Sequence, residues 1–482
     1  MTPDLHAIDR ALPVRIRAAL EAFEVPGAVI AVVRGDQDYL MTYGATAHDR
    51  DDPVRPDTPF DVGSCAKSYV SAAVAILASE GKLSLDDPVR RYVPELELDD
   101  PWISDHITLR DFLSNRTGLM RQRPIEAFPN AELSVLDIIA RMGRLRRVHP
   151  FRAGFVYFNL GFMTAALAVE RVSGMPYAQF LAEKLFAPLG MTASASGSLA
   201  YRTLQGRALG HTLQDGRVHV IADMIFDSTQ GAGCVHSSGA DALRWLRFHM
   251  REQGAGIVSP ALMRELHSPH TIMPSEETGL MHRVPEASLC DYCLGWWTSQ
   301  LGEHRLVQHS GGMFGWRAMT SFLPGADIGV AVYLNSARNV HHAIAYMVLE
   351  AMLGRPIRDW TRIAQDHAAT VARDFTQWVA QVYPLRADAP ELTLDACGGR
   401  YVHPVAGQIE IVHSGDGLLM KQLDGRLWDL ALTPVGGGLF EAIFDNIAVR
   451  DYMPAAGRVR FVADGGEVVA FEEPGTRYER CD

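Results

Sequence analysis

Strand-like segments lie at both ends of the first 354 residues, and helical segments fill the interval between them. The β-branched apolar run at 28–33 is followed by a turn and a returning run at 39–43, which is the pattern of a hairpin. Further strand patterns appear only late, at 306–308, 318–323 and 329–334. The two ends are therefore expected to meet in one antiparallel sheet flanked by helices, with a helical block inserted. This is an α/β (α+β) architecture.

A second unit follows this part of the chain. Residues 355–391 predict a connector, with a helix at 355–382 and a linker at 384–390. From residue 392 to 482 the sequence pattern changes to short strand patterns separated by glycine turns. These strand patterns lie at 407–412, 418–422, 439–442, 459–462 and 468–472. They predict a separate all-β domain, a small barrel.

Composition excludes several classes of partner. The chain has 482 residues, of which 48% are apolar and 21% are charged, as in ordinary globular proteins. Its formal charge of −12 argues against nucleic acid and anionic membranes as partners. No run of 18 apolar residues predicts a membrane span. The first 17 residues lack the apolar stretch of a secretory signal, so we expect a cytoplasmic protein.

The cysteines do not indicate a metal site. Six cysteines are sparse for this length, which fits a reducing compartment. Cys290 and Cys293 form a lone C-x-x-C, and neither a second pair nor histidines at ligand spacing follow. We therefore predict inert thiols, no metal and no cofactor.

Ser64 and Lys67 open a long, apolar helix pattern of small residues that runs to Ser79 and stops at Gly81. Residues three apart share a helix face, so the Lys67 ammonium can reach the Ser64 hydroxyl. Serine is a weak nucleophile until a base takes its proton. A lysine in an apolar setting near the positive end of a helix loses its own proton more easily. Ser-x-x-Lys is common by chance, so the pair predicts a nucleophile and base only together with other motifs.

Tyr157 and Asn159 form a second candidate motif, within the stretch 155–161. A tyrosine beside an ammonium group can relay a proton, and the Asn159 amide can donate to a substrate carbonyl. Taken alone, the same residues also fit a core tyrosine followed by a capping asparagine.

His309, Gly311 and Gly312 form a third candidate motif at the predicted end of a strand. Glycines there let the backbone approach a ligand closely. A backbone N–H at this strand edge is a candidate oxyanion donor together with the N–H of Ser64. Taken alone, the segment also fits an ordinary Ser-Gly turn.

Together, these three motifs resemble those of the serine β-lactamase and penicillin-binding-protein-like hydrolases, which are Ser-x-x-Lys, Tyr-x-Asn and Lys/His-x-Gly. Their order and spacing are similar to the class C-like branch, which includes D-aminopeptidases, DD-carboxypeptidases and carboxylesterases. Segments 26–28, 60–64, 113–119, 231–238 and 294–297 carry the likeness further. The resemblance implies a hydrolase domain at 1–354. The tail at 392–482, with its segment 394–401, resembles the lipocalin-like domains attached to some of these hydrolases.

The resemblance implies a role for each motif residue. Ser64 would be the acylated nucleophile, and Lys67 would be its base or proton relay. Tyr157 would help to activate Ser64, protonate the leaving group and then activate the deacylating water. Asn159 would orient Lys67 and the substrate, and His309 would line the pocket and contact the substrate or leaving group. The N–H groups of Ser64 and Gly312 would form the oxyanion hole.

One departure bears on the substrate. The third motif begins with His309, and a histidine is mostly neutral at pH 7. Many β-lactamases and DD-peptidases have a lysine at this motif position, which suits a substrate carboxylate. We therefore predict a serine hydrolase of small amides, peptides or esters, with D-amino-acid amides and carboxylic esters equally open, and disfavour a true β-lactamase.

Two other classes stay open. An acyltransferase would use the same acyl-enzyme with an amine in place of water. A non-catalytic binding protein is disfavoured because Ser64, Lys67 and Tyr157 are all present. The expected partner is a small molecule. The tail leaves three roles open, namely covering the active-site mouth, forming a homodimer or stabilising the chain.

Overall fold

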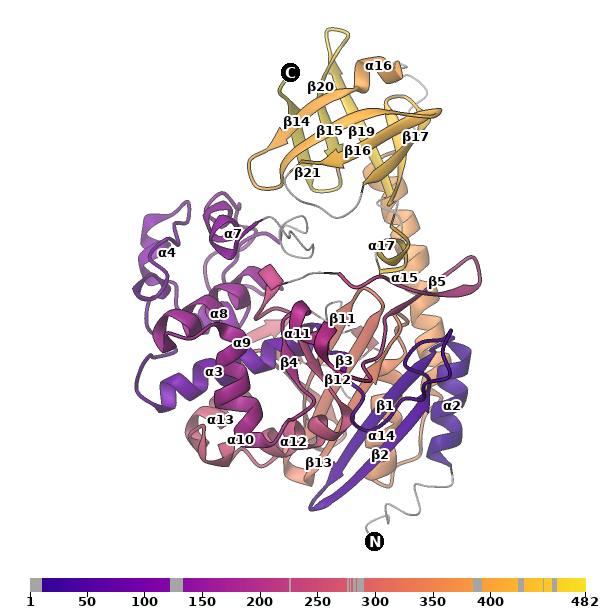
Figure 1. Ribbon diagram of the computed structural model, residues 1–482. Coiled ribbons are helices and arrows are strands. Elements are labelled where there is room, and N and C mark those ends of the chain that lie inside the picture. Colours follow the sequence, from indigo (N-terminus) through magenta and orange to yellow (C-terminus); the bar gives the residue numbers. More distant parts are fainter. Residues whose placement is uncertain are drawn as a thin grey trace.

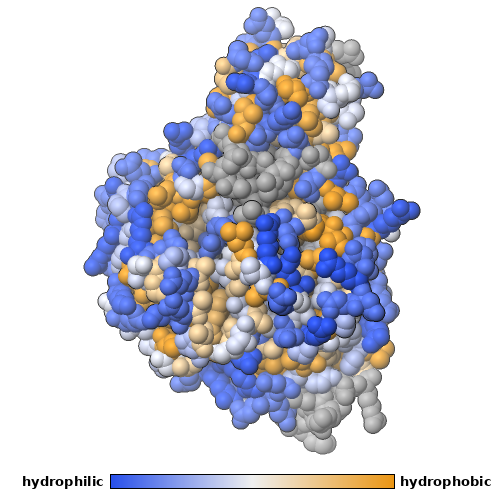
Figure 2. Space-filling view, viewed as in Figure 1, coloured by the Kyte–Doolittle hydropathy of each residue, from blue (hydrophilic) through white to orange (hydrophobic). Residues whose placement is uncertain are grey.

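The computed structural model describes residues 11–121, 133–224, 227–274, 277, 279–280, 283, 290–384, 392–423, 429–444, 446–452 and 457–482. A part built from one large sheet and surrounding helices comes first in the chain, and a barrel follows it (Figure 1). Polar and apolar side chains are interspersed over the face shown in Figure 2. Within the described ranges, no helix is both long enough and apolar enough to span a bilayer.

The large sheet is antiparallel and joins the two ends of the first part, as predicted. Its order is β2-β1-β13-β12-β11-β10-β9-β8. The predicted hairpin is β1 (Gly27–Arg34) and β2 (Gln37–Gly44), and β13 (Ile328–Leu334) pairs with β1. The other strands are β8 (Thr271–Met273), β9 (Cys290–Tyr292), β10 (Trp297–Leu301), β11 (His304–Met313) and β12 (Trp316–Leu323).

Helices cover both faces of the sheet, which explains why β1 is a continuous apolar run instead of an alternating one. Its residues Ala28, Ile30 and Val32 pack in one cluster with α2 (Leu12–Ala22) and α14 (His341–Met352). The intervening residues Val29, Ala31 and Val33 point to the other face. There they join a second cluster with α3 (Ala66–Ser79) and α12 (Gly239–Met250).

The inserted helical block lies beside α3 (Figure 1). It contains α4 (Pro101–His106), α5 (Leu109–Leu113), α7 (Val135–Met142), α8 (Asn159–Ser173), α9 (Tyr177–Leu181), α10 (Ala187–Leu189), α11 (Ser198–Thr203) and α13 (Pro260–Leu266). Two small sheets accompany it: β3 (Phe60–Asp61), β7 (Val235–Ser237) and β4 (Ala195–Ser196), and the hairpin of β5 (His211–Gln214) and β6 (Arg217–Val220). These short strands were not predicted.

The connector is the helix α15 (Trp360–Val382), and its first turn is tied to α14 by Glu350. This buried carboxylate accepts from the Trp360 indole at 2.8 Å and from Arg358 Nε at 2.5 Å. Of the predicted linker, residues 385–390 lie outside the described residues. The predicted boundaries at 354 and 391 stay a proposal.

The tail is a barrel, as predicted. It has eight strands, and it is closed because the last strand pairs with the first. The strands are β14 (Gly399–His403), β15 (Gly407–Ser414), β16 (Gly417–Gln422), β17 (Leu430–Gly436), β18 (Leu439–Phe444), β19 (Gly457–Asp464), β20 (Glu467–Glu473) and β21 (Thr476–Arg480). Short helices α16 (Leu394–Cys397) and α17 (Ile447–Tyr452) accompany them. Aromatic and aliphatic side chains fill its core, among them Tyr401, Met420, Phe461 and Phe471.

Candidate active site

Ser64 lies in a 3-10 turn (Gly63–Cys65) that leads into α3. The predicted helix at 64–79 therefore begins two residues later, at Ala66. The difference arises because Gly63 adopts a left-handed φ of 51°, which turns the chain sharply out of β3. Ser64 is half-buried at this corner, and Lys67 lies one turn further on in the helix.

Lys67 is fully buried, at 0% exposure, and its ammonium contacts the serine. Nζ lies 3.1 Å from Ser64 Oγ and 3.0 Å from the carbonyl oxygen of Ala232. It also lies 4.7 Å from the centre of the Tyr157 ring. The contact predicted from three-residue spacing is therefore present, and the ammonium also donates to the Ala232 carbonyl.

Strand β11 packs closely against the turn that carries Ser64. A Cβ at Gly311 would lie 1.9 Å from the carbonyl oxygen of Val62, and a Cβ at Gly63 would lie 2.7 Å from the backbone nitrogen of Gly312. Only glycines permit this approach. As a result, Ser64 and Gly312 come to line the same cavity.

His309 lies inside β11 and not at a strand end, so that part of the prediction is wrong. The pairing of β11 with β12 continues past His309 to Met313, so Gly311 and Gly312 also lie within the regular strand. The side chain is 1% exposed and stacks on Trp297 with a 5.0 Å centroid distance. Burial, and then the positive charge of Lys67, lowers the pKa of His309 to about 3.

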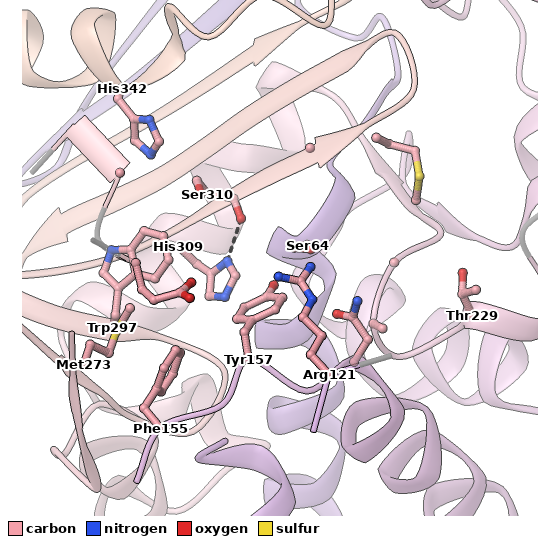
Figure 3. Close-up of a pocket in the computed structure, with 17 residues that line it drawn as sticks. Ser64, Arg121, Phe155, Tyr157, Thr229, Met273, Trp297, His309, Ser310 and His342 are labelled. Carbon is pink, nitrogen blue, oxygen red and sulfur yellow. Dashed lines mark hydrogen bonds between the residues drawn. The ribbon is translucent and has the colours of Figure 1, made fainter. Parts of the chain in front are cut away.

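Tyr157 and Asn159 come from the segment that leads into α8. Asn159 is the first residue of that helix and is buried, and the backbone N–H of Phe158 donates to Asn115 Oδ1 at 2.9 Å. The Tyr157 ring has the Lys67 ammonium near it, and the Arg121 guanidinium lies 5.3 Å from its centre. Figure 3 shows Tyr157 close to both Ser64 and His309.

The motif residues surround a cavity of about 250 Å³. Of the seven predicted site residues, Ser64, Tyr157, Asn159, His309 and Gly312 line it. Lys67 and Gly311 are not among the lining residues. They contact the serine and the turn that carries it.

Other lining residues were missed by sequence reasoning. They are Arg121, Phe155, Thr229, Ala232, Gly233, Met273, Glu277, Gly279, Trp297, Ser310, Met313 and His342. Trp297 belonged to a segment that carried the family likeness, and Phe155 lies in the stretch around Tyr157. Ala232 and Gly233 lie in another such segment, 231–238, and Ser310 lies inside the third motif. Seven lining residues belong to no recognised motif, namely Arg121, Thr229, Met273, Glu277, Gly279, Met313 and His342.

The described ranges contain no group of three or more His, Cys, Asp or Glu side chains arranged to hold a metal ion. Cys290 and Cys293 are both buried and do not form a disulfide. The Cys293 thiol donates to the His267 carbonyl at 3.2 Å, and burial raises the pKa of Cys290 to about 11.

Comparison with known proteins gives consistent matches. Residues 15–352 match the family described as Beta-lactamase. Unguisins hydrolase ungD' of Aspergillus campestris (strain IBT 28561) is 25% identical over 422 residues, which are 82% of this chain and 76% of that protein. Protein flp of Staphylococcus aureus (strain COL) is 24% identical over 321 residues, which are 66% of this chain and 61% of that protein.

Solved structures share the fold. The octameric penicillin-binding protein homologue from Pyrococcus abyssi has a TM-score of 0.64 at 21% identity, over 97% of this chain and 98% of that chain. A class C beta-lactamase mutant has a TM-score of 0.58 at 18% identity, over 71% of this chain and 97% of that chain. The first of these covers nearly the whole of this chain.

Proposed function

Because the chain belongs to the beta-lactamase family, we propose that it is a serine hydrolase that forms an acyl-enzyme on Ser64 with small amides, peptides or esters. The observation that carries this proposal is the 3.1 Å contact between Lys67 Nζ and Ser64 Oγ at the wall of a cavity. A buried lysine nitrogen in contact with the serine can take the serine proton when the lysine is in its neutral amine form.

In the proposed acylation, Ser64 Oγ attacks the substrate carbonyl carbon while its proton passes to the Lys67–Tyr157 pair. The N–H groups of Ser64 and Gly312 stabilise the negative charge that develops on the carbonyl oxygen. The C–N or C–O bond then breaks, and Tyr157 returns the proton to the leaving group. Water hydrolyses the ester on Ser64 with the same pair acting as base. Asn159 orients Lys67 and the substrate.

For His309 we propose a supporting role and not a direct bond from its ring to the substrate. Nε2 lies 3.0 Å from the Tyr292 hydroxyl, and Nδ1 lies 2.6 Å from the Ser310 carbonyl oxygen. Both ring nitrogens thus have protein partners. Because the His309 ring is neutral, the charged side chains among the described lining residues are those of Arg121 and Glu277.

The test is hydrolysis of three chromogenic substrates: D-alanine p-nitroanilide, its L-enantiomer and p-nitrophenyl butyrate. We expect turnover of at least one by the wild type and none by Ser64→Ala. Ser268→Ala is the matched control, because that hydroxyl donates to Arg264 O on α13, away from the cavity. Selective cleavage of the D-anilide supports an amino-acid amidase, and cleavage of the ester alone supports a carboxylesterase. Turnover that survives in Ser64→Ala would overturn the proposal.

A further inference from the structure

Asp61 is a buried carboxylate three residues before Ser64 in the chain. It ends β3, its exposure is 5%, and its Oδ1 accepts from the backbone N–H of Gly63 at 2.7 Å. It is not among the residues that line the cavity around Ser64. Burying a carboxylate is costly, so a position that retains one calls for a reason.

We propose that Asp61 is a positioning residue for catalysis, which holds the Gly63 peptide so that Ser64 and the Gly312 N–H keep their spacing. The inference rests on the proposed function, because it assumes that Ser64 is the nucleophile. No contact between Asp61 and the substrate is implied.

Gly63 packs closely against β11. Its backbone is left-handed, and its Cα faces the backbone of Gly312 so closely that a Cβ would lie 2.7 Å from that nitrogen. A rotation of the Gly63 peptide would therefore move Ser64 relative to β11. The hydrogen bond from the Gly63 N–H to Asp61 restrains this peptide. Its two partners are only two residues apart in the chain, so the bond acts directly on the turn.

A residue of a second strand packs beside the carboxylate. His236 lies directly opposite Asp61 in the pairing of β3 with β7, and its Nδ1 is 3.6 Å from Asp61 Oδ2. The imidazole is 3% exposed and stacks on Tyr201 with a 4.1 Å centroid distance. Asp61 therefore has one oxygen bonded to the Gly63 N–H and the other beside a buried ring, so the bond to Gly63 is the hydrogen bond that orients it.

Asp61 has both neutral and charged titratable neighbours, and Arg202 and Asp223 line the same small cavity as Asp61. The groups that act on it or on His236 are His236 from β7, Tyr201 from α11, Cys65 from the Ser64 turn, Cys234 and Arg207. Burial raises the pKa of Asp61 to about 7 and lowers the pKa of His236 to about 3. Of these two residues, Asp61 is therefore the one that gains or loses a proton near neutral pH. Its ionised form is the stronger acceptor for the Gly63 N–H.

The test compares two substitutions at one position. Asp61→Ala removes the acceptor, and Asp61→Asn keeps a carbonyl oxygen for Gly63 but cannot ionise. With a fluorophosphonate probe and the best chromogenic substrate, we expect Asp61→Ala to lower acylation and kcat by about 100-fold with KM little changed, since small misplacements of reacting groups cost that much. Asp61→Asn keeps an acceptor, so it should lose less than Asp61→Ala and should retain the activity that the wild type shows below pH 7, where Asp61 is protonated.

A wild-type acylation rate in folded Asp61→Ala would overturn the inference, as would an equal loss in Asp61→Asn. If Asp61→Ala does not fold, the pH profile of Asp61→Asn decides. The wild type should show an inflection of kcat/KM near pH 7 that Asp61→Asn lacks, whereas a merely structural carboxyl group would leave the two profiles the same. Failure of the proposed function is distinguishable, because Ser64→Ala would then still react with the probe.

Discussion

The Tyr292 hydroxyl lies 3.0 Å from Nε2 of His309, and both side chains are buried. The other ring nitrogen, Nδ1, lies 2.6 Å from the Ser310 carbonyl oxygen, which can only accept. Nδ1 therefore carries the proton, and Nε2 accepts from the tyrosine. The arrangement defines a single tautomer of a neutral imidazole at the wall of the cavity.

This neutrality predicts the pH behaviour of a His309 variant. Because its pKa is lowered to about 3, His309 stays neutral at every pH above 5 and contributes no inflection there. We expect His309→Gln to lower kcat/KM without moving the pH of any inflection between 5 and 9. The measurement is kcat/KM against pH for both proteins. Disappearance of an inflection in the variant would show that His309 titrates in this range.

The Tyr292 hydroxyl should also contribute to stability. Tyr292→Phe leaves the buried Nε2 of His309 without its donor, at an expected cost of about 1–3 kcal/mol in the free energy of unfolding. Tyr177→Phe is the matched control: Tyr177 is also buried, but its hydroxyl has no hydrogen-bond partner among the described residues. Urea denaturation measures both. Equal losses in the two variants would mean that the bond to His309 contributes nothing.

Lys67→Met should abolish most catalysis while the protein stays folded. Methionine fills the buried volume without an amine, so Ser64 loses the group that is proposed, in its neutral form, to take its proton. We expect kcat/KM to fall by about 10²–10⁴-fold, the usual contribution of a general base. The control is Lys82→Met, which removes an exposed ammonium paired with Glu80 at 2.7 Å. Retention of wild-type turnover by Lys67→Met would exclude Lys67 as the base.

Gly311→Ala tests the close approach of β11 to the Ser64 turn. Its Cβ would lie 1.9 Å from the Val62 carbonyl oxygen, so the strand and turn must separate. We expect a loss of about 1–3 kcal/mol from overpacking and a fall in kcat of about 100-fold. Gly325→Ala is the control, because a Cβ there meets nothing within 4 Å. Thermal unfolding and turnover are measured for both, and a fully active Gly311→Ala would contradict the contact.

Asp61 should make stability depend on pH in a defined direction. It ionises near pH 4 in the unfolded chain and near pH 7 in the folded protein. Between these values the folded state binds the additional proton, so its contribution to stability falls as the pH rises from about 4 to about 7. Asp61→Asn cannot ionise, so its stability relative to the wild type should rise from pH 5 to pH 8. Urea unfolding at both pH values measures this, with Asp57→Asn as the exposed control. A difference that does not change with pH would contradict the prediction.

Much of the fold could be predicted because its signals are local. The hairpin of β1 and β2, the helices at 109–114, 135–142 and 160–172, and five of the eight barrel strands follow from patterns of adjacent residues. The barrel strands β14, β17 and β21 were not predicted. The contact between Ser64 and Lys67 is of the same kind, because three residues of helical spacing suffice to create it. Strands of two or three residues, such as β3, β4 and β8, carry too little pattern to be recognised.

By itself, the sequence determined the sheet-and-helix part, the barrel, and the identity and order of the residues around Ser64, because spacing along the chain specifies helices, hairpins and motifs. Tertiary structure alone decided how distant segments meet. It brought the Ala232 carbonyl to Lys67, Tyr292 to His309, and His236 to Asp61. Such contacts arise from packing between elements far apart in the chain, where the partner of a buried polar group depends on the whole fold and not on the residues beside it.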